Sequence, residues 1–279
     1  MKRPIFGSGW KMFFTDKEAV TYGQKLKESI KDEKEVELFV LPSFTVLDRI
    51  GSILADTDIS IGAQNMCWED RGAFTGEVSA VSLREMGVKY IEIGHSERRE
   101  LFGENNTAIN LKIKTALKHN MIPIFCMGEN NDEKDKNLTK ELLATEIKTA
   151  LFGVPYKDAV KIIYAYEPVW AIGRENSAQP DYAEEILKFI RELLSSMYVE
   201  TEGGSEYKLV YGGSVSLNNI GELIKRPNID GVFVGRASLN IDSYMEMLDI
   251  MKSGSKSCQP GIGIRNKKGG LISEGSNRK

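Results

Sequence analysis

Residues 89–127 read KYIEIGHSERRELFGENNTAINLKIKTALKHNMIPIFCM, and they contain one complete repeat of the pattern that decides the fold. A short β-rich run at 89–94 is followed by a helical pattern over 105–119 and by a second short run at 122–127. The second run is almost continuously apolar, which is typical of a strand covered on both faces in a parallel sheet. The stretch therefore predicts a strand–helix–strand unit.

The same alternation extends over residues 1–252. Longer helical patterns cover residues 16–31, where Asp16 is expected to be the N-cap, and residues 105–119, 138–151 and 181–197. Eight such units in about 250 residues predict an α/β fold, the closed (β/α)8 barrel of eight parallel strands ringed by helices. An open doubly wound sheet for dinucleotide binding gains no support, because no G-x-G-x-x-G follows the first run. The eight short runs span residues 4–9, 36–41, 59–63, 89–94, 122–127, 161–166, 207–211 and 231–235.

Composition narrows the class of protein. The net charge of −3 argues against nucleic acid as the main partner. The longest apolar run, at 121–127, is far shorter than the roughly 20 residues of a membrane-spanning helix, and the N-terminus lacks the apolar core of a secretory signal. The odd number of widely spaced cysteines and the presence of only two histidines indicate free thiols without a metal site. We therefore expect a cytoplasmic protein.

The last 27 residues, 253–279, differ from the rest of the chain. They include six Gly, five Ser and six Lys or Arg against one Glu, with few large apolar residues. Such a segment buries too little apolar surface to offset its ordering entropy. We predict a single catalytic barrel over 1–252 and a flexible basic Gly/Ser-rich tail over 253–279, which is either solubilising or a tether to anionic partners.

Polar residues that follow the predicted strands indicate where the chemistry lies, because active sites of such barrels lie at the carboxyl ends of the strands. Lys11 follows the first run, His95 follows the fourth and Glu167 follows the sixth. Each alone would more often be a surface lysine, a structural histidine or a salt-bridged carboxylate. Their common placement at one end of the barrel favours a proton-transfer site.

Two glycine-rich loops follow the seventh and eighth runs, Gly212-Gly213-Ser214 and Gly235-Arg236. Glycine lets backbone N–H groups approach an anion closely, and these two loops form the usual phosphate site of such barrels. The sequence therefore predicts a small phosphorylated substrate.

Several longer motifs make a family resemblance specific. Residues 3–250 resemble the triosephosphate isomerase family, which has the TIM-barrel fold. The matching stretches are GAQN at 62–65, GAFTGE at 72–77, GHSERR at 94–99, FGE at 102–104, AYEPVWAIG at 165–173 and YGGSV at 211–215.

The resemblance implies a role for each polar residue at the strand ends. Glu167 would be the general base, and His95, as a neutral imidazole, would polarise the substrate carbonyl and shuttle protons between the enediolate oxygens. Lys11 would supply positive charge, and Glu97 would hold the polar network near Lys11. Because only protons move, no metal or organic cofactor is expected.

The resemblance also implies binding and closing segments. Backbone N–H groups at Gly173, Ser214, Gly235 and Arg236 would bind the phosphate. Residues 168–178 would form a lid, and Thr75 lies on a loop, 67–79, that would insert into a neighbouring subunit of a homodimer. The lid includes Pro168, Val169, Trp170, Ala171 and Ile172, and Tyr211 would help to hold it shut.

Three positions depart from the family pattern. Gly9 stands where the family usually has a substrate-binding asparagine, which removes a hydrogen bond and is expected to free a small volume. The second half of the lid is altered at 174–177, and Gly235-Arg236 replaces Gly-Gly.

These departures leave three hypotheses open. The family default is isomerisation of triose phosphate, which belongs to glycolysis and gluconeogenesis. The second is isomerisation of erythrulose phosphates, as in a branch of the family with a different residue at the asparagine position. The third is a non-catalytic phosphate-binding scaffold, against which the presence of Lys11, His95 and Glu167 argues.

Overall fold

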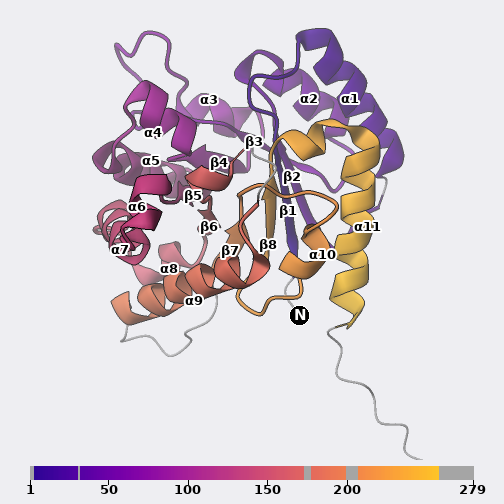
Figure 1. Cartoon of the computed structure of the whole chain (residues 1–279). Coiled ribbons are helices and arrows are strands. Elements are labelled where there is room, and N and C mark those ends of the chain that lie inside the picture. The colour runs from indigo at the N-terminus through magenta and orange to yellow at the C-terminus, as the bar shows by residue number, and fades with distance from the viewer. Residues whose placement is uncertain (1–2, 31, 173–176, 199–206, 258–279) are drawn as a thin grey trace, which may run out of the picture.

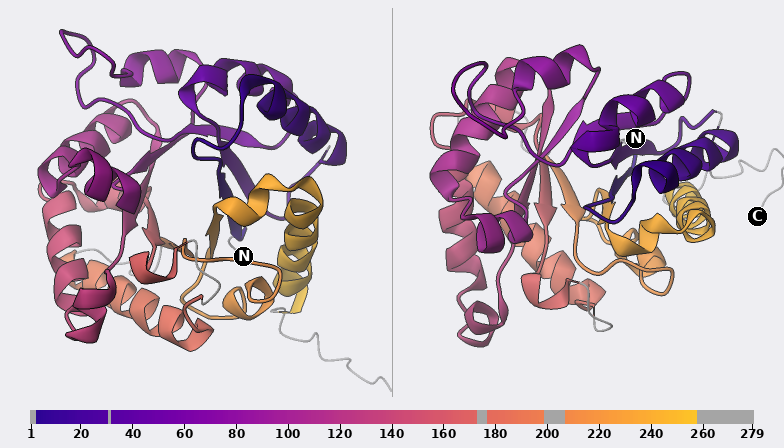
Figure 2. Two further views of the ribbon diagram at one scale, coloured as in Figure 1. Left: turned by 45° about the horizontal axis from the view of Figure 1, so that its top comes forward. Right: turned by 90° about the horizontal axis from the view of Figure 1, so that it is seen from above.

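The computed structural model describes residues 3–30, 32–172, 177–198 and 207–257. Eight parallel strands, one after another in chain order, close into a barrel because β8 pairs back onto β1 (Figures 1 and 2). All eight predicted strands are present, and no strand end differs from its predicted position by more than two residues. The strands are β1 (Ile5–Gly9), β2 (Glu37–Leu41), β3 (Ser60–Ala63), β4 (Tyr90–Ile93), β5 (Ile122–Met127), β6 (Ile163–Tyr166), β7 (Lys208–Tyr211) and β8 (Gly231–Val234).

Helices surround the barrel on its outer side, as the two views of Figure 2 show. The four predicted helical patterns correspond to α1, α5, α7 and α9. The helices are α1 (Asp16–Ser29), α2 (Leu47–Leu54), α3 (Ala80–Glu85), α4 (Ser96–Phe102), α5 (Asn106–Lys118), α6 (Asn131–Asp135), α7 (Thr139–Ala150), α8 (Tyr156–Ala159), α9 (Pro180–Met197), α10 (Ile220–Leu223) and α11 (Ile241–Ser257), with short 3-10 turns η1 (Phe44–Val46), η2 (Val169–Ala171) and η3 (Arg236–Leu239).

The N-cap of α1 differs from the prediction. Thr15, not Asp16, caps the helix, and its side chain accepts a hydrogen bond from the backbone N–H of Glu18. The carboxylate of Glu18 accepts one in return from the backbone N–H of Thr15, at 2.8 Å. This reciprocal pair satisfies two helix-end donors, which Asp16 cannot do from inside the first turn.

The strands separate two apolar cores, one inside the barrel and one between the strands and the helices. Along β4, Tyr90 belongs to the inner core, whereas Ile91 and Ile93 belong to the outer core. Since successive strand residues face opposite sides, Glu92 must face the barrel interior, as Tyr90 does. The inner core consists of Ile5, Phe39, Leu41, Tyr90, Ile124, Cys126, Ile163, Ala165, Val210 and Phe233.

The C-terminal helix continues beyond the expected end of the barrel. Helix α11 ends at Ser257, so residues 253–257 of the expected tail have a helical backbone. Residues 258–279, including Cys258, lie outside the described residues. Cys67 and Cys126 are buried free thiols. Within the described ranges, no helix combines the length and the apolar character needed to cross a membrane.

Candidate active site

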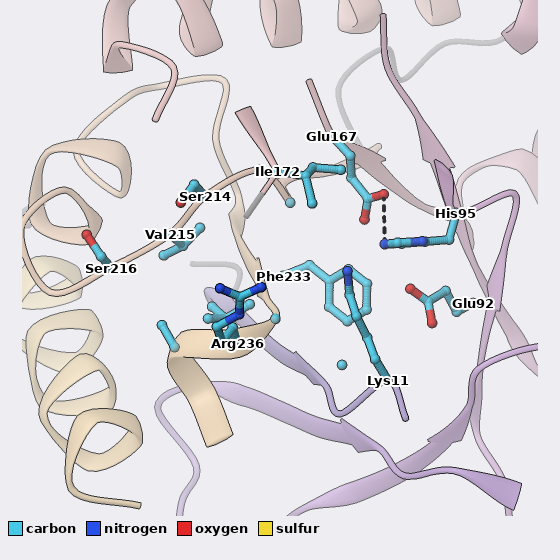
Figure 3. Close-up of a pocket in the computed structure, with 16 residues that line it drawn as sticks. Lys11, Glu92, His95, Glu167, Ile172, Ser214, Val215, Ser216, Phe233 and Arg236 are labelled. Carbon is cyan, nitrogen blue, oxygen red and sulfur yellow. Dashed lines mark ion pairs between the residues drawn. The ribbon is translucent and has the colours of Figure 1, made fainter. Parts of the chain in front are cut away.

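A cavity of about 330 Å³ opens at the carboxyl ends of the strands (Figure 3). The barrel brings residues of β1, β4 and β8, and of the segments that follow β1, β4, β6, β7 and β8, to this one place. Eight of the predicted site residues line the cavity: Gly9, Lys11, His95, Glu167, Ile172, Ser214, Gly235 and Arg236.

His95 and Glu167 face each other across the cavity. Nε2 of His95 lies 3.6 Å from Oε2 of Glu167, and both side chains are buried. His95 is the N-cap of α4, and its Nδ1 accepts a hydrogen bond from the backbone N–H of Glu97 at 3.2 Å. We assign the ring proton of the neutral imidazole to Nε2, because Nδ1 is the acceptor. The helix end thus aims an N–H donor into the cavity.

Glu167 is a buried carboxyl group with unused hydrogen-bonding capacity. Burial raises its pKa above the ordinary value, and the neighbouring His95 and Lys11 oppose that rise. Its Oε2 has no hydrogen-bond partner among the described residues. The backbone beside it must be glycine, because a Cβ on Gly212 would lie 2.8 Å from Cγ of Glu167. The group is therefore free to accept a proton from a substrate.

Lys11 is held in place from two sides. Its Nζ donates a hydrogen bond to Oε1 of Glu97 at 2.6 Å, and its carbonyl accepts one from Nε2 of Gln64 at 2.8 Å. Lys11 has a φ of +48°, in the left-handed region that a lysine rarely adopts. Burial favours a higher pKa for Glu97, but the hydrogen bond and charge of Lys11 outweigh it and lower that pKa. The pair keeps a fixed positive charge at the cavity.

The opposite end of the cavity is suited to an anion. Ser214 and Gly235 line it, and Figure 3 shows the guanidinium of Arg236 pointing into it. The family resemblance implied only a backbone donor at Arg236. Arg236 forms no ion pair with the described part of the chain, and its guanidinium lies 5.9 Å from the ring of Phe13. Its positive charge is available to a phosphate.

The predicted lid begins at a well-anchored hinge. Pro168 precedes η2, which contains Val169, Trp170 and Ala171, and Nε1 of Trp170 donates a hydrogen bond to Glu129 at 2.8 Å. Gly173 and residues 174–176 lie outside the described residues. At the end of the predicted lid, the backbone of Ala178 lies close to the Tyr211 phenol. Burial raises the pKa of this phenol, and the backbone of Ala178 opposes the rise.

Comparisons with known proteins agree with this geometry. A family model described as triosephosphate isomerase matches residues 4–252. The chain is 44% identical over 244 residues to a protein named triosephosphate isomerase from Carboxydothermus hydrogenoformans, covering 88% of this chain and 97% of that protein. It is 42% identical over 248 residues to one with the same name from Dictyoglomus turgidum, covering 89% of this chain and 99% of that protein.

The chain belongs to the triosephosphate isomerase family. The motifs quoted from the sequence thus indicated the correct family, and the (β/α)8 barrel is the expected fold. Two further residues that line the cavity, Glu92 and Phe233, were not predicted from the sequence.

Glu92 places a second buried carboxyl group in the cavity. One ligand atom from each of Glu92, His95 and Glu167 lies within 4.8 Å of the others, an arrangement that is also able to hold a cation. Burial raises the pKa of Glu92 to about 7, and the neighbouring His95 partly opposes that rise. The sequence offered one signal by which Glu92 could have been found. It lies two residues after Tyr90, in a predicted strand that leads directly to His95.

Phe233 changes the interpretation of Gly9. A Cβ on Gly9 would lie 3.3 Å from Cζ of Phe233. The space beside Gly9 is therefore bounded on one side by this aromatic ring of the neighbouring strand β8, while Gly9 itself lines the cavity.

Thr75 lies outside the cavity, on the long loop between β3 and α3. Thr75 is exposed, as are its neighbours Phe74 and Gly76. Within one chain, the predicted dimer loop therefore does not line the cavity.

Proposed function

We propose that the protein interconverts dihydroxyacetone phosphate and glyceraldehyde 3-phosphate. The observation that carries this proposal is the facing pair His95 and Glu167, 3.6 Å apart in a buried cavity with the charge of Lys11 beside it. An N–H donor and a carboxylate in this arrangement can act on the two atoms of a hydroxycarbonyl group, the oxygen and the carbon-bound proton.

The proton moves in a closed cycle. With the phosphate at Ser214, Gly235 and Arg236, Glu167 removes a proton from C1 of dihydroxyacetone phosphate. His95 donates its Nε2 proton to the C2 oxygen, and the C1 hydroxyl returns a proton to His95. Glu167 then protonates C2, which gives glyceraldehyde 3-phosphate.

Charge and exclusion of water support this cycle. Lys11, fixed by Glu97, lowers the energy of the negatively charged enediolate, since preorganised charge is most effective in a closed site. We propose that the lid, residues 168–178, closes over the substrate and that Tyr211 helps to hold it shut. Closure would keep water away from the enediolate and prevent loss of phosphate.

Steady-state turnover of dihydroxyacetone phosphate tests the proposal. Wild type is expected to turn it over, and Glu167→Asp is expected to reduce kcat by about 100-fold or more, because the shorter side chain withdraws the carboxylate from the carbon. Binding of inorganic phosphate to both proteins is the control for an intact site. Phosphate binding without any turnover by wild type would instead support the scaffold hypothesis.

A four-carbon ketose phosphate is the second candidate substrate. The observation that favours it is the carboxyl group of Glu92, at the side of the cavity away from Ser214 (Figure 3). L-Erythrulose 1-phosphate and D-erythrulose 4-phosphate would interconvert through the same enediolate chemistry.

We also propose a homodimer. Large apolar side chains are exposed after each of the four neighbouring strands β1 to β4, and a self-complementary interface would cover them. Met12 is 92% exposed, and the loop with Thr75 follows β3, on the same half of the barrel. These exposed side chains are Met12, Phe13, Phe44, Trp68, Phe74, Leu101 and Phe102.

The same family assignment supports a cytoplasmic location and a single catalytic barrel that ends near residue 252. We propose that the remaining basic segment takes no part in the reaction. Deletion of residues 258–279 is expected to leave turnover unchanged.

A further inference from the structure

We propose that Glu146 is a positioning residue of the isomerase, which keeps His95 and Glu167 in place through the guanidinium of Arg99. Glu146 lies on α7, does not line the catalytic cavity and takes no part in the proton transfers described above. The inference extends the proposed function and rests on it. It concerns how the two reacting groups are held at the correct separation.

Arg99 ties together the carboxyl ends of two strands. Its Nε donates a hydrogen bond to the carbonyl of Gly94 at 2.7 Å, and its Nη2 donates one to the carbonyl of Cys126 at 3.4 Å. Gly94 directly follows β4, and Cys126 lies next to the last residue of β5. One rigid, planar guanidinium therefore fixes the spacing of these two strand ends.

Each of these strand ends leads to one of the reacting groups. Gly94 directly precedes His95, and its φ of +79° is in the left-handed region that glycine adopts readily. A Cβ on Gly94 would lie 3.1 Å from the carbonyl oxygen of Cys126. On β5, the carbonyl of Met127 accepts a hydrogen bond from the backbone N–H of Glu167 at 2.8 Å. A displacement of either strand end would therefore move His95 relative to Glu167.

Glu146 is the charged partner that holds Arg99 in this position. Its Oε1 lies 3.2 Å from Nη1 of Arg99, and the same nitrogen donates a hydrogen bond to Oδ1 of Asn106 at 2.6 Å. Both side chains of the pair are largely buried, and Arg99 forms no other ion pair with the described part of the chain. Removal of one partner from a buried pair leaves the other charge without compensation, so Arg99 is expected to shift when Glu146 is truncated.

A second cavity, of about 160 Å³, lies beside this pair. Glu146, Arg99 and Glu167 line it, together with Val169 at the start of the proposed lid. Oε2 of Glu146 is buried and has no hydrogen-bond partner among the described residues. This oxygen is available for a proton, and protonation would remove the charge that faces Arg99.

The surroundings of Glu146 bring its titration close to neutral pH. Burial raises its pKa to about 7, and the neighbouring Arg99 opposes that rise. The carboxylates of Glu133, on α6, and Glu129, after β5, reinforce the rise. Glu100, on α4, also lines the second cavity. Because the ionised form holds Arg99 more firmly than the protonated form, we expect the catalytic pair to be better placed as the pH rises through 7.

The test measures kcat and KM for dihydroxyacetone phosphate in wild type and three variants. Glu146→Leu is expected to lower kcat by about 10-fold and to change KM by less than about three-fold, because the phosphate end of the catalytic cavity is not touched. Glu146→Gln keeps an acceptor for Arg99 and is expected to retain about half of the wild-type kcat or more. Glu141→Gln, at an exposed position of the same helix, is the matched control and should leave kcat unchanged.

The pH profile separates positioning from a merely structural role. From about pH 6 to pH 8, kcat of wild type is expected to contain a rise that Glu146→Gln lacks, because glutamine does not titrate. The ratio of the wild-type kcat to the variant kcat should therefore grow by about two-fold or more over this range. A loss of stability alone would not change this ratio at temperatures well below unfolding.

A second readout does not need turnover. The chain contains only two histidines, His95 and His119, so His119→Asn assigns their imidazole signals in an NMR spectrum. Glu146→Leu is expected to shift the Nε2 signal of His95, whereas Glu141→Gln should leave it unchanged.

The outcomes separate this inference from the proposed function. A kcat of Glu146→Leu within about two-fold of wild type, or a kcat ratio for Glu146→Gln that is constant over the pH range, would overturn the inference and leave the isomerase assignment intact. If Glu146→Leu does not fold, the pH profile of Glu146→Gln decides. If wild type does not turn over the triose phosphate, the proposed function fails, and the His95 signal decides: a shift supports the positioning role and an unchanged signal rejects it.

Discussion

The ring of Phe233 lies 3.3 Å from the point where Gly9 would carry a Cβ, so the two residues share one volume at the top of the barrel. Gly9 pairs with Leu41 of β2, and Phe233 lies on the other neighbouring strand, β8. A side chain at one position therefore limits the size of the side chain at the other.

This relationship predicts a coupled pair of substitutions. Gly9→Ala is expected to lower the free energy of unfolding by about 1–3 kcal/mol, because the added methyl group overpacks against Phe233. Combined with Phe233→Leu, the same change should cost less. Urea unfolding of the two single variants and the double variant gives the coupling energy, and strict additivity would show that the two side chains do not share space.

The hydrogen bond between Lys11 and Glu97 predicts a loss of catalysis without loss of fold. Glu97→Gln keeps the shape but removes the charge that positions Nζ of Lys11, 2.6 Å away. We expect kcat to fall by about 10-fold or more and the melting temperature to change little, since the pair is half-exposed. Glu100→Gln, on the same helix α4, is the matched control. An unchanged kcat would mean that Lys11 does not need this partner.

Glu92 predicts a specific dependence of stability on pH. Its pKa rises from 4.5 to about 7 in the fold, so between these values the folded state binds more protons than the unfolded state. The contribution of Glu92 to the free energy of unfolding is therefore fully present below pH 4.5. It is lost as the pH rises through 7, and the loss amounts to about 3 kcal/mol in all. Glu92→Gln, which cannot titrate, should gain stability relative to wild type over this range. Parallel unfolding curves of the two proteins from pH 5 to pH 8 would contradict the assignment.

The hydrogen bonds that Glu129 accepts lead to a prediction for the start of the proposed lid. Its carboxylate accepts hydrogen bonds from Tyr166, Trp170 and Tyr182, and Lys134 lies over the ring of Trp170. Glu129→Gln leaves one acceptor oxygen for these donors, and we expect a loss of about 1–3 kcal/mol in the free energy of unfolding. Trp170 fluorescence should change with it. If only stability changed and kcat did not, the hinge would not depend on this anchor.

The proposed dimer predicts the effect of a charge on its loop. Thr75→Arg would place a long cationic side chain in the covered interface, where an unpaired charge is costly. Sedimentation velocity is expected to show a dimer for wild type and a monomer for the variant, with reduced turnover. Arg84→Glu, on helix α3 after the loop, serves as the surface-charge control. A monomeric wild type would reject the proposed assembly.

The sequence patterns located every end of the eight strands to within two residues. In contrast, the predicted Asp16 cap was wrong, because Thr15 and Glu18 form a reciprocal pair that only the local backbone geometry selects. Helix ends depend on one or two hydrogen bonds, so sequence patterns locate them less well than they locate whole elements.

The sequence by itself determined the barrel, the family and the convergence of Lys11, His95 and Glu167, because these depend on repeated local patterns and on the common end of parallel strands. Only the tertiary structure decided what fills the cavity. Glu92 and Phe233 acquire their meaning from strands that are distant in the chain, and packing across the barrel decides which side chain meets Gly9 and which carboxyl groups line the cavity.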